Sequence, residues 1–280
     1  MSFLDRIAEC NRHEPERYVP FHIGSAQVGA VRRDRLKLLD SYPELAILPG
    51  KSVALADFLV EPTLQTAALN KIVRVMCSRG ICDPWRGEPY PVGPRFGEVL
   101  CEIERAGAEF FGLTAYGVHL NGYVRESGGL KIWVPRRTID RPTYPGELDN
   151  TVAGGQPSDL TVFENLVKEC DEEAGLPRSL VEQAVPVGTV SYTVDGRVGR
   201  KHEIIFNYDL ELSADLVPEN RDGEVENFEL WPVERAMEVV AKTSDFKFNC
   251  ALVLIDFFVR HGLIAPDHPD YVPICRGLNR

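Results

Sequence analysis

Residues 154–176 read GGQPSDLTVFENLVKECDEEAGL, which is a glycine pair, a short loop and a helix with carboxylates along one side. Thr161 and Glu164 have the spacing of a capping box, so we expect the helix to begin at Thr161. Gly175 stands where the C-terminus of a helix favours a residue with positive φ. An apolar stripe at helical spacing should face the core: Val162, Phe163, Leu166, Val167 and Cys170.

The carboxylates of this helix indicate a metal site. Glu169, Glu172 and Glu173 lie at positions i, i+3 and i+4, so they share one face. Carboxylates this close repel one another, and Mg²⁺ removes the repulsion when substrate phosphates supply its further ligands. An acidic run on a helix is usually only a solvated face. The ordered combination of glycine pair, fixed spacing, carboxylate pair and closing glycine favours the metal site here.

The whole pattern resembles the Nudix box, Gly-x5-Glu-x7-Arg-Glu-U-x-Glu-Glu-x-Gly-U, in which U is an apolar residue. Aligned without gaps from Gly154, the segment places Glu169 and the following glutamate pair on the box glutamates. Two positions depart from the box. Leu160 stands at the first glutamate, and Lys168 replaces the arginine, which keeps the charge but loses the planar fork.

Composition bounds the class of protein. The 280-residue chain has a formal net charge of −11 and is 44% hydrophobic, which is ordinary for two modest globular domains. The acidic balance argues against a general nucleic-acid binder, whose affinity would rest on a basic face. The first residues lack the apolar segment of a signal peptide, and no apolar run reaches membrane-spanning length. We therefore expect a cytoplasmic protein without a membrane partner.

The order of the predicted elements indicates an α/β (α+β) fold. We expect a small mixed α/β domain over residues 1–112, a larger domain over 113–265 and a C-terminal tail over 266–280. The larger domain should be a mixed sheet between helices, the α/β/α sandwich of the Nudix fold. Its expected strands cover 117–125, 130–135, 148–153, 185–193, 202–212 and 228–231, and its later helices 233–241 and 249–262. In the small domain we expect helices over 3–11, 63–77 and 99–110, and strands over 26–31 and 52–55.

Further segments extend the resemblance over residues 2–275. They are GVHLNGYV at 117–124, YPGELDNTVAGG at 144–155, and DGEVE at 222–226 with Trp231. They resemble the Nudix proteins that carry an N-terminal domain of unknown function and are labelled thiamine-pyrophosphokinase-related. The resemblance implies a hydrolase of phosphorus-containing anhydrides that converts thiamine diphosphate, and preferentially its damaged oxo and oxy analogues, to the monophosphate.

The resemblance also implies roles for the box residues. Glu172 and Glu173 would be ligands of Mg²⁺ or Mn²⁺, and Glu169 would be a ligand or the base that activates water. Lys168 would orient a box carboxylate in preference to touching the substrate. The backbone at Gly154–Gly155 would approach the metal or phosphate closely, where a side chain would obstruct.

Candidates outside the box carry weaker signals. A later loop often supplies a further base in Nudix enzymes, and Glu224 and Glu226 are the candidates, with an acidic surface loop as an equal alternative. Arg136 and Arg137 follow an apolar strand and could hold the terminal phosphate. Adjacent strand residues point opposite ways, so at most one of them does so. His119 lies between apolar strand residues, and we expect a structural, hydrogen-bonded histidine.

Several alternatives stay open at this point. An enzyme similar to the isopentenyl-diphosphate isomerases, a hydrolase of nucleoside diphosphate derivatives and a catalytically silent binding protein all share related folds. The expected partner is a small-molecule diphosphate, and the N-terminal domain would form one wall of its pocket or a contact in a homodimer. A kinase is not favoured, because Gly50-Lys51-Ser52 lacks the glycine that a P-loop needs at Leu45.

Overall fold

A six-stranded mixed sheet forms the centre of the larger part of the protein in the computed structural model, which describes residues 1–48, 52–141 and 143–279. Its strands are β7 Thr114–Glu126, β8 Gly129–Arg137, β9 Val152–Gly155, β10 Val185–Asp195, β11 Arg200–Glu211 and β12 Val225–Pro232. Their order is β10-β11-β7-β8-β12, with β9 paired to β7. β11 and β7 run parallel, and the other pairs are antiparallel.

Strand β7 has different neighbours along its length. Its first half pairs with β9, where Gly117 lies opposite Gly155. Its end forms a hairpin with β8, where Tyr123 lies opposite Ile132. Beyond this point β8 pairs with β12 and, at Arg136, with Leu148 just before β9, so β8 and β7 diverge. The gap between them admits β9 and brings the glycine pair to the middle of the sheet.

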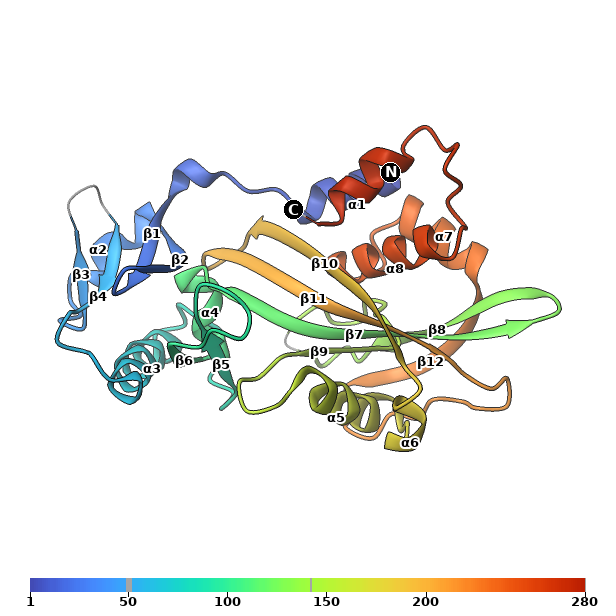
Figure 1. Ribbon diagram of the computed structural model, residues 1–280, viewed down its shortest axis with the longest axis horizontal. Helices are drawn as coiled ribbons and strands as arrows, with labels where there is room; N and C mark the ends of the chain where they lie inside the picture. The colour runs from blue at the N-terminus through green and yellow to red at the C-terminus, as the bar shows by residue number, and fades with distance from the viewer. Residues whose placement is uncertain (49–51, 142, 280) are drawn as a thin grey trace.

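Helices cover both faces of the sheet, as expected for the α/β/α sandwich (Figure 1). Alternation along β7 explains how both faces are buried, because Val118 and Leu120 face one core while His119 and Asn121 point to the opposite side. α5 and α6 lie on the first face, and α7 and α8 on the second. The helices are α5 Val162–Ala174, α6 Arg178–Val181, α7 Val233–Lys242 and α8 Phe248–Arg260.

The N-terminal part builds a second core around a four-stranded sheet of order β2-β1-β4-β3. Its strands are β1 Tyr18–Ile23, β2 Ala26–Arg32, β3 Leu45–Ile47 and β4 Val53–Leu55. The helical segments are η1 Pro15–Arg17, η2 Arg33–Arg35, α2 Leu36–Leu39, α3 Pro62–Ser78 and α4 Arg105–Phe111. A separate hairpin of β5 Pro89–Val92 and β6 Cys101–Glu104 packs beside α3 and α4.

The first and last helices of the chain lie together on the large sheet. α1 (Phe3–Cys10) and α9 (Tyr271–Gly277) contact each other, and α1 also packs on α8 (Figure 1). Ile7 of α1 and Ile274 of α9 are buried in the same core. α1 therefore packs with the large sheet although it precedes the small one, and the segment expected as a tail contains a helix.

Most expected elements of the large sheet are confirmed, with ends that differ by a few residues. The helix expected over 99–110 is wrong in its first half, where Cys101 and Ile103 alternate with Glu102 and Glu104 as strand β6 and the helix begins only at Arg105. Gly50 and Lys51 lie outside the described residues. No helix within the described ranges is long and apolar enough to cross a membrane.

Candidate functional site

The box helix begins and ends as its sequence predicts. Thr161 Oγ1 accepts a hydrogen bond from the backbone N–H of Glu164, and the Glu164 carboxylate accepts one from the N–H of Thr161. Gly175 closes α5 with a φ of 64°. Asn165, which the sequence did not single out, is fully buried and donates from Nδ2 to the carbonyl of Gly155. This bond fixes the loop between β9 and α5.

Two of the three box glutamates point at β9. Glu173 is buried and accepts a hydrogen bond of 2.8 Å from the backbone N–H of Ala153. Glu169 lies against Gly154 so closely that a Cβ added there would come within 2.3 Å of the Glu169 carboxyl carbon. A glycine at 154 is thus required by the carboxylate beside it.

The third glutamate turns toward solvent. The Glu172 side chain is 44% exposed, and its carboxylate lies 2.8 Å from Nζ of Lys168. The same ammonium lies 3.1 Å from Glu169. Burial alone would lower the pKa of Lys168, but these two carboxylates raise it. Lys168 therefore pairs with two box carboxylates, and its role in orienting them stays a prediction.

The inward carboxylates fit a divalent cation. Burial, with the charges of Glu169 and Asp149, raises the pKa of Glu173 to about 8, and burial also raises the pKa of Glu169. A cation between these carboxylates would remove that penalty, and oxygen donors suit Mg²⁺ or Mn²⁺. In the part of the chain that the structure describes, no three acidic, histidine or cysteine side chains are already gathered as a closed metal site. Glu172 would have to leave Lys168 to join such a site.

A later loop reaches the end of the box helix. The backbone N–H groups of Arg221 and Asp222 donate to the carbonyl of Glu172. Glu224 follows in the same loop and forms an ion pair with Arg141. Glu226 is exposed on the outer side of β12. The structure therefore brings one of the two expected loop glutamates toward the site.

The two adjacent arginines at the end of β8 diverge, as their strand positions require. Arg136 donates from Nη1 to the carbonyl of Gly146, away from the cavity described below. Arg137 lines that cavity, but each of its three guanidinium nitrogens already donates within the protein. The acceptors are the carbonyls of Thr143 and Tyr144 and the carboxylate of Asp149. Arg137 thereby holds the loop that leads into β9.

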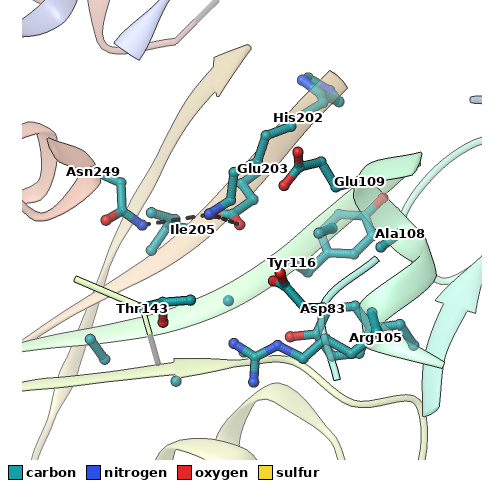
Figure 2. A pocket seen from close by; sticks show the side chains of 18 of the residues that line it. Asp83, Arg105, Ala108, Glu109, Tyr116, Thr143, His202, Glu203, Ile205 and Asn249 are labelled. Atoms are coloured by element: carbon teal, nitrogen blue, oxygen red, sulfur yellow. Dashed lines mark hydrogen bonds and ion pairs between the residues drawn. The ribbon is translucent and has the colours of Figure 1, made fainter. Parts of the chain in front are cut away.

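A cavity of about 200 Å³ opens beside Gly154 and Gly155 (Figure 2). Its wall is strongly basic although the chain as a whole is acidic, which favours anions such as phosphates. The cationic side chains among its described lining residues are Arg86, Arg105, Arg137, Arg141, Arg200, Lys201 and Lys247, and the anionic ones are Asp83, Glu109 and Glu203.

Several of these lining residues carried no signal in the sequence. Arg105 and Tyr90 belong to the N-terminal part, and Lys201 is the second residue of β11. Lys201 Nζ lies 3.5 Å from Glu203 and 5.6 Å from the ring centre of Tyr144. Tyr144 has a φ of 52°, and is the one residue other than glycine with positive φ among those described. Strained backbone of this kind is concentrated at functional sites.

His119 also lines the cavity and is hydrogen-bonded within the protein, as expected. Its Nδ1 lies 2.7 Å from Oδ1 of Asn150. Burial lowers the pKa of His119 to about 4, so the ring is neutral at physiological pH. The hydrogen bond to Asn150 belongs to a buried polar network that continues to Asn121 and Asp209.

A second cavity of about 970 Å³ adjoins the first. It lies between the segment that follows α1, the start of β11 and the start of α8. Five residues line both cavities: Asp83, Glu109, Thr143, Tyr144 and Lys201. Tyr144 stands at this junction, whereas Trp133 and Trp231 belong to the cores.

The chain resembles known proteins over its whole length. A model of the Nudix domain matches residues 117–251, and a model described as a domain of unknown function, DUF4743, matches residues 2–115. Nudix hydrolase 24, chloroplastic, of Arabidopsis thaliana is 42% identical over 99% of this chain and 77% of its own length. This chain belongs to the Nudix hydrolase family. It is therefore a hydrolase of phosphorus-containing anhydrides.

One further relative and two solved structures of other proteins are also similar to this Nudix hydrolase. Nudix hydrolase 20, chloroplastic, of the same plant is 39% identical over 99% of this chain and 77% of its own length. DR0079 from Deinococcus radiodurans is 21% identical, with a TM-score of 0.47 over 60% of this chain and 97% of that one. The NUDIX domain of Shewanella oneidensis NrtR, solved with ADP ribose, is 14% identical, with a TM-score of 0.43 over 54% and 90%.

Proposed function

We propose that this Nudix hydrolase cleaves the diphosphate linkage of a small organic diphosphate, with Mg²⁺ or Mn²⁺ as cofactor. One observation carries the proposal: two inward carboxylates contact β9, the half-buried Glu169 at Gly154 and the buried Glu173 at Ala153, and these β9 residues line a cavity whose wall is mostly basic. Carboxylates suit a divalent cation, and the basic wall suits the phosphate oxygens that share it.

Each site residue has a distinct task in this proposal. Glu169 and Glu173 would hold the cation beside β9, and Glu172 would join them by leaving Lys168. Such an ion would supply neutralisation of phosphate charge and a lowered pKa of water. Gly154–Gly155 lets the phosphates approach the backbone. Glu224, held by Arg141, is the candidate for a further base.

The proposed substrate is thiamine diphosphate or one of its oxo or oxy analogues, which would be cleaved to the monophosphate. The resemblance of residues 117–124, 144–155 and 222–226 to the thiamine-pyrophosphokinase-related subgroup supports it. The two adjoining cavities also suit a substrate with a compact charged end and a larger organic end. The diphosphate would occupy the inner cavity, and the organic group would pass Tyr144 into the outer one.

The alternatives are less well supported. An isomerase of the isopentenyl-diphosphate type needs a catalytic thiol, but no cysteine is among the described residues that line either cavity. Cys250 is buried behind the inner cavity and donates to Asp149, and burial holds the pKa of its thiol well above the usual value. A silent binding protein would be expected to lose the glutamates of the helix face, and Glu169, Glu172 and Glu173 are all present, although Leu160 replaces the first glutamate of the box. Nucleoside diphosphate derivatives remain the competing substrate class.

A substrate panel tests the proposal. Purified protein is incubated with thiamine diphosphate, its oxo and oxy analogues, ADP and isopentenyl diphosphate, with Mg²⁺ or with EDTA. We expect release of inorganic phosphate and the monophosphate, highest kcat/KM for the thiamine analogues, and no turnover in EDTA or in Glu173→Gln. Turnover that persists in EDTA, or an isomerised product without phosphate release, would overturn the proposal.

Three expectations drawn from the sequence stay predictions. They are the domain boundaries 1–112, 113–265 and 266–280, the cytoplasmic location and a homodimer. The names of both plant relatives include the word chloroplastic, which describes those proteins.

A further inference from the structure

The N-terminal part places an arginine at the glycine pair of the box. Arg105 is the first residue of α4, and its side chain lines the inner cavity (Figure 2). A Cβ added at Gly155 would lie 3.6 Å from the guanidinium carbon of Arg105. The guanidinium group therefore stands directly beside the backbone that is expected to face the phosphates. None of the roles assigned above uses it.

The surroundings hold Arg105 in a defined position. Its Nη1 donates to Glu88 at 2.8 Å, and its guanidinium carbon lies 5.7 Å from the ring centre of Tyr90. The preceding residue, Glu104, is buried and accepts from the backbone N–H groups of Arg86 and Gly87. These bonds join the start of α4 to the segment that leads through Glu88 into β5, which carries Tyr90. The contacts with Glu88 and Tyr90 reduce the side-chain freedom that Arg105 would lose when a ligand binds.

The hairpin that carries this region is also joined to the box loop. Ser158 donates from its backbone to the carbonyl of Pro89 and from Oγ to Glu102 at 2.6 Å. One of these acceptors lies on β5 and the other on β6. Hydrogen bonds to both strands of this hairpin therefore hold the box loop beside the region that carries Arg105.

We propose that Arg105 is a substrate-binding residue, whose guanidinium holds a phosphate group of the substrate at Gly154–Gly155. Nε and Nη2 make no hydrogen bond to another described residue, so this edge of the fork is available to two phosphate oxygens. Lys201 supplies a second cation from β11. The N-terminal domain thereby completes the phosphate site of the Nudix domain. The identity of the anion rests on the proposed function.

The alternative is a purely structural role, in which Arg105 only pairs with Glu88. Two variants separate the roles. Arg105→Gln removes the charge and the fork, whereas Glu88→Gln removes the pairing but leaves Arg105 charged at the cavity. Arg95→Gln is the matched control, because Arg95 lies in the same part of the chain, is exposed and pairs with Glu98. Arg105→Lys keeps the charge and loses the planar fork, and it carries the test if Arg105→Gln does not fold.

The probe is inorganic diphosphate, titrated calorimetrically into the full chain in EDTA, so that the readout is independent of turnover. We expect Arg105→Gln to weaken binding by about tenfold or more and Arg105→Lys by less, as for loss of a charge-assisted hydrogen-bond pair. Glu88→Gln and Arg95→Gln should bind within about twofold of the unmodified protein. In assays with Mg²⁺, Arg105→Gln should raise KM more than it lowers kcat.

Three results would overturn the inference. The first is an unchanged affinity for inorganic diphosphate in Arg105→Gln or, if that variant does not fold, in Arg105→Lys. The second is an equal loss of affinity in Glu88→Gln and Arg105→Gln. The third is that the unmodified protein does not bind inorganic diphosphate. Failure of the proposed function looks different. The protein would then bind inorganic diphosphate in an Arg105-dependent way and yet hydrolyse no organic diphosphate.

Discussion

The hydroxyl of Tyr90 lies against the backbone of Gly155, so that a Cβ added at Gly155 would come within 1.9 Å of the phenolic oxygen. The next nearest atom, the ring carbon that carries this oxygen, would be 3.1 Å away. Burial raises the pKa of Tyr90 to about 12, so the hydroxyl is neutral at physiological pH. One atom of the N-terminal part thus limits what residue 155 can be.

We therefore expect Gly155→Ala to impair the enzyme and Tyr90→Phe to rescue it. The added methyl group must displace Tyr90 and, with it, the neighbouring wall of the cavity. Overpacking of this kind costs about 1–3 kcal/mol. Removing the phenolic oxygen relieves the tightest contact. The measurement is a double-mutant cycle in Tm and kcat/KM, and strictly additive effects would contradict the direct contact.

The box glutamates should differ little in activity although they differ in burial. Glu172→Gln and Glu173→Gln each remove a ligand charge and keep the shape, so each should lower kcat about a hundredfold or more with the fold intact. Glu182→Gln is the control, because Glu182 is an exposed glutamate nearby that pairs only with Arg178 among the described residues. Near-normal turnover in both box variants, with no effect of EDTA, would exclude the metal site.

The buried carboxyl of Glu173 should make the metal-free protein less stable as the pH rises. Its folded pKa of about 8 exceeds the ordinary value of 4.5. Between these values the folded state keeps a proton that the unfolded state has lost, so stability falls with increasing pH, by on the order of 1.4 kcal/mol per pH unit. The Glu173→Gln variant has no carboxyl group at this position, so it does not lose stability with rising pH for this reason. The Tm of the variant in EDTA should exceed that of the unmodified protein by a margin that grows up to about pH 8, and a margin independent of pH would contradict the burial of this charge.

The first helix should stabilise the large sheet without touching the chemistry. Ile7 is 3% exposed and packs in the core that contains α8. Ile7→Ala should lower the free energy of unfolding by about 2–4 kcal/mol, as for other buried aliphatic side chains. The control is Val272→Ala in α9, because Val272 is largely exposed. Denaturant unfolding measures the loss of stability. An unchanged KM, measured at a temperature where the variant is folded, would show that the substitution does not affect the active site.

Local chemistry made the box helix predictable. All its signals lie within one segment: the capping pair Thr161–Glu164, the apolar stripe and Gly175. The two caps form through hydrogen bonds between residues close in sequence. The helix expected over 99–110 was wrong in its first half because the local pattern there was ambiguous. Its apolar residues fit both a helical and a strand period, and pairing with β5 across the hairpin selected the strand.

The cavity wall could not be predicted in the same way. Arg105 and Lys201 are separated by many residues, and no spacing rule relates them. They meet because α4 packs against β11, where Glu109 accepts hydrogen bonds from the backbone N–H groups of Val198 and Gly199. A charged residue at the start of a strand or helix is common on surfaces, so neither position stood out from the sequence. Only the tertiary contact turns these two side chains inward to one cavity.

The pairing of α1 with the end of the chain has a consequence for synthesis. The guanidinium of Arg6 donates to the carbonyl of Phe246, and Cys10 donates to that of Phe248, across about 240 residues of sequence. A ribosome releases the first helix long before it makes these acceptors. The large sheet can therefore bury its second face only after α8 has emerged, so this half of the molecule must complete its folding late in translation or after release, while the small N-terminal sheet has all its strands available early.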